Sequence, residues 1–151
     1  MSMISIHDNE ILAYTVDLAN KTIRLDTTWS SKERSEHTLV EFRGVLTHYF
    51  IGDCHQNVLT SIEEEPLEIF LSENLALLQE MKYTCWPCMY AHSYDECGNE
   101  NLLRQRLQEE QVKYFRLYAA IGVDGWVLAR EMEFIALGDS PQAGYDHFDI
   151  Y

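Results

Sequence analysis

Residues 112–137 read VKYFRLYAAIGVDGWVLAREMEFIAL and decide the fold. Two runs of β-favouring residues flank Gly122-Val123-Asp124-Gly125, where both glycines tolerate a positive φ, so we predict a β-hairpin. The alternation places one set of side chains of the first arm on an apolar face, Phe115, Leu117, Ala119 and Ile121, opposite Tyr114, Arg116 and Tyr118. On the second arm the predicted apolar face is Trp126, Leu128, Met132 and Phe134, interrupted by Arg130. This hairpin is expected to form the centre of an antiparallel sheet.

Further segments of alternating apolar residues extend this sheet. We expect strands at residues 10–18, 21–29, 37–45 and 57–62, whereas residues 46–51 are apolar without a clear period. Helical spacing predicts an amphipathic helix over residues 66–81 and a peripheral helix over residues 99–111. The chain thus reads as one α+β domain over residues 1–151: a single antiparallel sheet of about six strands with two helices packed against one face. Residues 138–151 form a polar and aromatic tail, which is either loose or tied down by Tyr145, Phe148 and Tyr151.

Length and composition are those of an ordinary globular domain. The chain has 151 residues, of which 46% are hydrophobic and 24% charged. It holds no run of about 20 apolar residues that could cross a membrane. The N-terminus, MSMISIHDNE, lacks the basic and apolar regions of a signal peptide. Because proteins without an export signal usually stay in a reducing compartment, the four cysteines of the chain are expected to be reduced thiols. These features together predict a cytoplasmic protein.

The acidic charge is concentrated in one segment. The formal net charge is −14 at pH 7, and residues 61–80 contribute six acids and no base. Such a surface repels nucleic-acid backbones and anionic lipids, which argues against both as partners, and it attracts a basic protein. The strongest field is expected at Glu63, Glu64, Glu65 and Glu68, which we predict to be the partner-binding residues. The competing interpretation is that these acids only confer solubility or stabilise the start of the following helix.

One segment invites a chemical interpretation. Cys85, Cys88, His92 and Cys97 are spaced C-x2-C-x3-H-x4-C, and thiolates with an imidazole could hold a structural zinc ion. The spacing is one residue shorter than that of a CCHC zinc knuckle, and the basic residues of knuckles are lacking. The sequence CWPC also resembles a thioredoxin-type redox motif, but it follows a predicted helix rather than a strand of a βαβ unit. We therefore expect no bound zinc or other cofactor, and predict that these residues belong to an aromatic loop over the core.

The remaining polar residues do not predict catalysis. His7-Asp8, and His48 with Cys54 and His55, lie at expected strand ends and are interpreted as polar groups without a chemical role. Glu131 and Glu133 are two residues apart on one face of a strand, and we interpret them as solvated rather than catalytic carboxylates. No phosphate-binding loop, nucleophile elbow or H-E-x-x-H motif is present in the sequence.

Four stretches of the chain, taken together, form a pattern: IHDNEILAYTVDLANKTIRLDT, EFRGVLTHYF, IEEEPLEIFL and GVDGWVLA. This pattern resembles that of a group of small bacterial proteins of uncertain role, some of whose relatives are regarded as immunity proteins of polymorphic toxin systems. The cysteines of residues 85–97 do not belong to this pattern. The resemblance implies a non-enzymatic protein-binding module that neutralises a basic toxin. The alternatives are a zinc-stabilised adaptor and a thiol redox protein that uses Cys85 and Cys88.

Overall fold

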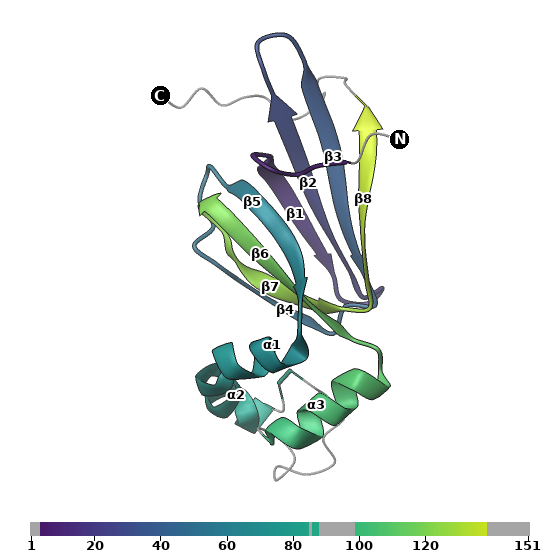
Figure 1. Ribbon diagram of the computed structural model, residues 1–151, viewed down its shortest axis with the longest axis vertical. Coiled ribbons are helices and arrows are strands. Elements are labelled where there is room, and N and C mark those ends of the chain that lie inside the picture. Colours follow the sequence, from purple (N-terminus) through teal and green to yellow (C-terminus); the bar gives the residue numbers. More distant parts are fainter. Residues whose placement is uncertain (1–3, 85, 88–98, 139–151) are drawn as a thin grey trace.

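The computed structural model describes residues 4–84, 86–87 and 99–138, and it is an α+β fold (Figure 1). The strands are β1 (Glu10–Asp17), β2 (Thr22–Ser30), β3 (Ser35–Arg43), β4 (Thr47–Ile51), β5 (Val58–Glu65), β6 (Lys113–Ile121), β7 (Asp124–Ala129) and β8 (Glu131–Gly138). The helices are α1 (Leu67–Glu73), α2 (Leu75–Met81), the short 3-10 helix η1 (Lys82–Thr84) and α3 (Glu100–Glu109). None of the helices in the described part of the chain is long and apolar enough to cross a membrane.

All eight strands belong to one open antiparallel sheet, in the order β4-β7-β6-β5-β1-β2-β3-β8. The antiparallel α+β class was predicted correctly, whereas the expected number of about six strands was wrong. One additional strand is β4, which comes from the apolar residues 46–51 and pairs with β7. The other is β8, because the predicted second arm of the hairpin is two strands instead of one.

The sheet folds back on itself as two halves of four strands (Figure 1). We call β4-β7-β6-β5 the first half-sheet and β1-β2-β3-β8 the second half-sheet. They are joined between β1 and β5, whose only residue pair in the ladder is Glu10 with Val58. Because so few bonds hold this junction flat, the two inner faces turn towards each other and bury a common core.

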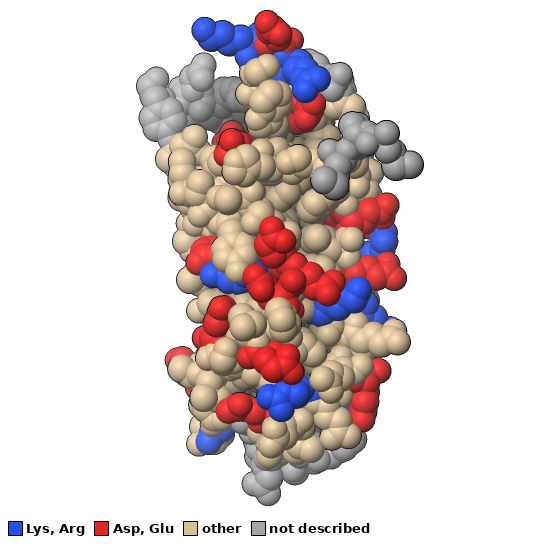
Figure 2. All heavy atoms as spheres, viewed as in Figure 1, with Lys and Arg blue, Asp and Glu red and all other residues tan. Residues whose placement is uncertain are grey.

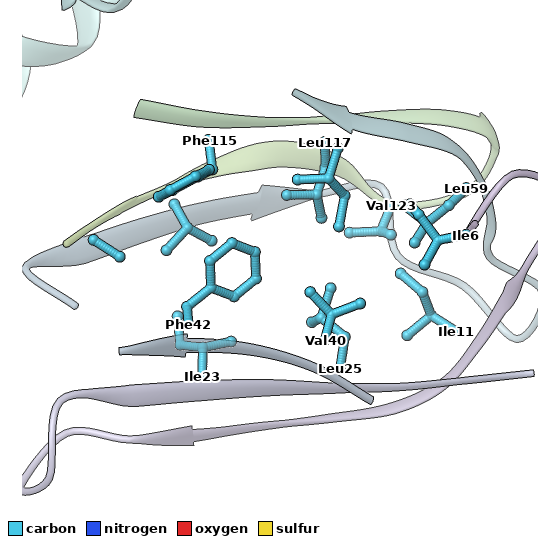
Figure 3. Packing of buried hydrophobic residues seen from close by; sticks show 13 residues of the cluster. Ile6, Ile11, Ile23, Leu25, Val40, Phe42, Leu59, Phe115, Leu117 and Val123 are labelled. Carbon is cyan, nitrogen blue, oxygen red and sulfur yellow. The ribbon is translucent and has the colours of Figure 1, made fainter. Parts of the chain in front are cut away.

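Apolar side chains from both halves fill the space between them. Figure 3 shows Ile23, Leu25, Val40 and Phe42 of the second half-sheet pointing towards Phe115 and Leu117 of the first. The rings of Phe42 and Phe115 meet edge to face at 5.7 Å between centroids. Phe115 and Leu117 are therefore buried, as their alternation predicted. Ala119 is half-buried, and Ile121, expected on the same face, is exposed at the rim.

The second arm of the hairpin departs from the prediction at Arg130. β7 pairs with β6, but β8 crosses to the far edge of the sheet and pairs with β3. The backbone N–H of Arg130 donates to the carbonyl of Arg43 at this corner. Consequently Trp126 and Leu128 face the helices, while Met132 and Phe134 pack against the core between the half-sheets. The four residues do not share a face, because the strand that would have carried them is broken.

The helices also differ from the prediction. The expected helix of residues 66–81 is divided at Asn74 into α1 and α2. The backbone of Asn74 is not helical, since its φ is −115° and its ψ is 15°. Its amide group donates to the carbonyl of Phe70, and its side-chain oxygen accepts from the indole N–H of Trp126 at 3.1 Å. The helix of residues 99–111 was expected to be peripheral, but α3 buries Leu103 and Leu107 against the same cluster. Three α-helices thus cover one end of the outer face of the first half-sheet (Figure 1).

Candidate protein-binding face

A second apolar cluster attaches the helices to the outer face of β6 and β7. At its centre is Trp126, whose ring lies 5.0 Å from that of Phe70 and 6.2 Å from that of Tyr114. Trp86, from the CWPC segment, adds a third ring at 5.8 Å and donates its indole N–H to the hydroxyl of Thr47. The cluster buries the end of this outer face that lies nearest the helices, and its described residues do not cover the part beyond Trp126.

The uncovered part combines aromatic and aliphatic side chains with carboxylates. Tyr49 stacks beside Trp126 at 6.0 Å and remains 37% exposed, and Ile51 and Tyr118 are 48% and 38% exposed. Residues directly opposite each other in an antiparallel pair point to the same face of the sheet. Asp124, which pairs with Ile51, and Glu63, which pairs with Arg116, therefore lie on this face. We define the acidic aromatic face as Tyr49, Ile51, Tyr118, Glu63, Glu65, Glu73 and Asp124.

Arg116 lies in the middle of this face and is fully engaged. Its guanidinium group binds both carboxylate oxygens of Asp124 and donates to the carbonyls of Leu117 and Gly125 at 2.7 Å. Its Nε atom lies 4.0 Å from a carboxylate oxygen of Glu73, and the guanidinium stacks on the ring of Tyr118 at 5.2 Å. The single base is thus matched by Asp124, so that Glu63, Glu65 and Glu73 give the face a net negative charge.

Two tyrosine hydroxyls hold these glutamates in place. Tyr118 donates to Glu65 at 2.7 Å, and Tyr114 donates to Glu73 at 3.3 Å. The bond to Glu65, followed by burial, raises the pKa of Tyr118, whereas burial, followed by the charge of Glu73, raises the pKa of Tyr114. Both phenols therefore stay neutral donors at physiological pH, and their hydrogen bonds restrict the orientation of the two carboxylates.

The ion pair of Asp124 predicts a pH dependence of stability. Hydrogen bonds from Arg116 hold the pKa of Asp124 below its usual value of 3.8. Because the folded pKa is the lower one, the stabilisation is complete above the unfolded pKa and is lost as the pH falls through the folded value. We expect wild type to be more stable than Asp124→Asn at neutral pH, with the difference shrinking below about pH 4. Urea unfolding of both proteins from neutral to acidic pH measures this, and a constant difference would contradict it.

The structure separates the four predicted partner-binding glutamates. Glu63 and Glu65 lie on the acidic aromatic face, paired in the ladder with Arg116 and Tyr114. Glu64 points to the opposite side, where Lys113 is 3.7 Å away, and Glu68 lies in the first turn of α1, 3.7 Å from Arg104. Glu63, Glu64 and Glu65 belong to strand β5, whereas Glu68 lies in the first turn of α1, where an acid interacts favourably with the helix dipole. The run therefore contributes two members, rather than four, to one surface.

Several carboxylates of the second half-sheet form ion pairs with bases. On the outer face of the second half-sheet, Arg43 binds Glu41, Glu131 and Glu133 at 2.9–3.1 Å, and Arg24 binds Glu41 at 3.0 Å. Glu131 and Glu133 are therefore held in cross-strand ion pairs and not simply solvated. Figure 2 shows one side of the molecule, where acidic side chains gather over the lower part of the sheet with fewer basic ones among them.

The histidines do not form a site with the cysteine that the structure describes. His7 contacts Asp8 at 3.6 Å and the carbonyl of Thr60, while the ring of His48 packs beside Phe50 and burial lowers its pKa. Cys54 is exposed and donates to a backbone carbonyl. In the described part of the chain, no three metal-binding side chains gather in one place. Cys85, Cys88, His92 and Cys97 lie outside the described residues, and so does the tail beyond Gly138.

Sequence reasoning did not select Tyr49, Tyr118 or Asp124 for this face. Tyr118 was correctly placed opposite the core side of the hairpin, and that alternation was the available signal. Tyr49 lay in a segment without a clear period, and Asp124 was taken as a turn residue, whereas β7 begins with it.

Comparisons of this chain with known proteins find no match. No family model matches the chain, and neither the curated proteins nor the solved structures contain a match.

Proposed function

We propose that this protein is a non-enzymatic binding module that attaches to a basic protein through the acidic aromatic face, as an immunity protein neutralises a basic toxin. The observation that carries the proposal is the exposure of Tyr49, Ile51 and Tyr118 beside Glu63 and Glu65, for which the described residues provide no ion-pair partner. The other two acids of the face, Glu73 and Asp124, share Arg116. The resemblance of four sequence stretches to immunity-like bacterial proteins supports the same function.

The chemistry of the face suits a protein partner. Tyrosine supplies a large contact area at a low entropic cost and is enriched among the residues that dominate binding energy. The carboxylates around it act mainly on the rate of encounter with a basic surface. Nucleic acid and anionic membranes would be repelled by the same charges. The alternatives, a zinc adaptor or a thiol redox protein, depend on Cys85 and Cys88, which lie outside the described residues.

Charge reversal on this face should slow association. We expect Glu63→Lys with Glu65→Lys to lower the association rate with the basic partner about tenfold or more at low salt and to flatten its salt dependence. The dissociation rate should change less, and the effect is screened over ~8 Å at physiological ionic strength. Association rates over a salt series, measured on the immobilised partner, test this prediction.

A matched control is Glu33→Lys with Glu109→Lys, which changes the net charge equally but lies outside the face. Unfolding curves should show that both double variants are folded, since all four side chains are on the surface. Equal slowing by the two pairs would mean that net charge, rather than this face, guides association.

The function itself is tested first by sequencing the genes that flank that of this protein. The proposal expects one of them to encode a basic toxin domain, which is then co-expressed with this protein. Wild type should form a complex with the toxin domain and restore growth, and Tyr49→Ala with Tyr118→Ala should weaken the complex by about 2 kcal/mol or more and abolish protection. Tyr83→Ala is the matched control, because Tyr83 is 73% exposed and lies outside the face. Failure of wild type to bind or protect would overturn the proposal, as would undiminished protection by the double variant at equal expression.

A further inference from the structure

A hollow of about 410 Å³ lies where four connections of the fold meet, and none of its lining residues belongs to the acidic aromatic face. They are the β1–β2 turn, the β3–β4 connection, the corner between β7 and β8, and the end of α3 with the residues leading into β6. The lining residues are Leu18, Lys21, Gly44, Val45, Leu46, Arg106, Leu107, Glu110, Val112 and Arg130. The volume is within the range of small-molecule sites, about 300–1,000 Å³.

Backbone hydrogen bonds fix the walls of this hollow. Val45 donates to the carbonyl of Lys21 at 2.9 Å, and Val112 donates to the carbonyl of Leu107 at 2.8 Å. The aliphatic part of Arg130 lies across Gly44, which has φ +63° and where a Cβ atom would meet that side chain at 2.9–3.0 Å. The hollow is therefore preformed, as ligand sites usually are.

The charge of the lining is opposite to that of the protein. Three of the 11 basic residues line it together with one acid, in a chain whose formal charge is −14. Arg130 binds Glu110 at 2.9 Å, and neither Lys21 nor Arg106 has an ion-pair partner among the described residues. Two cationic groups therefore remain for a ligand, beside an apolar lining of leucine and valine side chains.

We propose that this hollow binds a small amphipathic carboxylic acid, with its apolar body against Val45, Leu46 and Leu107 and its carboxylate at Lys21 and Arg106. Apolar contact supplies most of the affinity in such sites, and a few charged groups orient the ligand. The volume admits a single chain or ring system. Leu18, 81% exposed at the mouth, is covered when the ligand is bound. This site is separate from the proposed protein-binding function and does not depend on it.

Calorimetric titration with dodecanoate, below its micelle concentration, tests the site. We expect saturable binding of one molecule per chain, weakened about tenfold in Lys21→Gln with Arg106→Gln because two charge-assisted contacts are lost. Lys32→Gln with Arg34→Gln removes the same charge from the β2–β3 loop and should bind like wild type. Leu18→Glu should also weaken binding, and its exposure makes a folding defect unexpected.

Ligand controls separate the carboxylate from the chain. Dodecanol should bind more weakly than dodecanoate and should be insensitive to loss of Lys21 and Arg106, and dodecyltrimethylammonium should bind weakest. Three outcomes would overturn the proposal: no saturable binding of dodecanoate, equal binding of the acid and the ammonium compound, or equal loss of affinity in the two double variants.

Discussion

Trp126→Ala is expected to lower the free energy of unfolding by about 3–5 kcal/mol. Trp126 is 3% exposed and is surrounded by the rings of Tyr49, Phe70, Trp86 and Tyr114. Its removal leaves a cavity where the helices meet the first half-sheet, and it leaves the side-chain oxygen of Asn74 without the indole N–H that donates to it. Urea unfolding measures the loss, and hydrogen exchange should show that amides of α1, α2 and α3 lose more protection than those of β2 and β3.

Trp126→Phe provides the matched control. It keeps an aromatic ring in the cluster but removes the indole N–H, so the loss should be smaller and include about 1 kcal/mol for the bond to Asn74. A stability of Trp126→Ala within about 0.5 kcal/mol of wild type, as at ordinary surface positions, would mean that the helices do not depend on this side chain.

The second large effect is expected for Leu117→Ala, at about 2–5 kcal/mol. Leu117 is completely buried between the half-sheets, opposite side chains of β2 and β3. Because both walls of this core are hydrogen-bonded strands, the cavity cannot collapse easily, which places the cost in the upper part of the range. Denaturant titration of Leu137→Ala, whose side chain is 46% exposed on β8, should give a much smaller change. An unchanged midpoint for Leu117→Ala would show that the core lies elsewhere.

These two substitutions probe different layers of the molecule. Leu117 belongs to the core that joins the half-sheets, and Trp126 to the cluster that joins the helices to one of them. The acidic aromatic face begins where the second cluster ends, since Tyr49 stacks on Trp126 and remains exposed. We therefore expect Trp126→Ala to weaken binding of the partner as well. The cause would be displacement of Tyr49, because Trp126 itself is buried and does not contact the partner.

The candidate face shows where sequence reasoning succeeds and where it does not. The concentration of acids at residues 61–80 was evident from composition, and three of its six members, Glu63, Glu65 and Glu73, do lie on the face. Glu64 and Glu68 were grouped with them because they are close in sequence, but adjacent strand residues point to opposite sides. The bases that partner these two, Lys113 and Arg104, come from distant parts of the chain. Counting charges in a window therefore overestimated the uncompensated charge.

What the sequence determined by itself is local. The period-two pattern of residues 113–118 identified Phe115 and Leu117 as core residues, and the helical period of residues 66–81 and 99–111 located the helices. Only the tertiary structure decided that Trp126 and Leu128 face the helices and that β8 pairs with β3 at the far edge. The physical reason is that β7 is buried on both faces, so that its apolar residues follow one another without alternation. Alternation identifies a core face only when the other face is exposed to water, and the choice of strand partners depends on contacts between residues far apart in the chain.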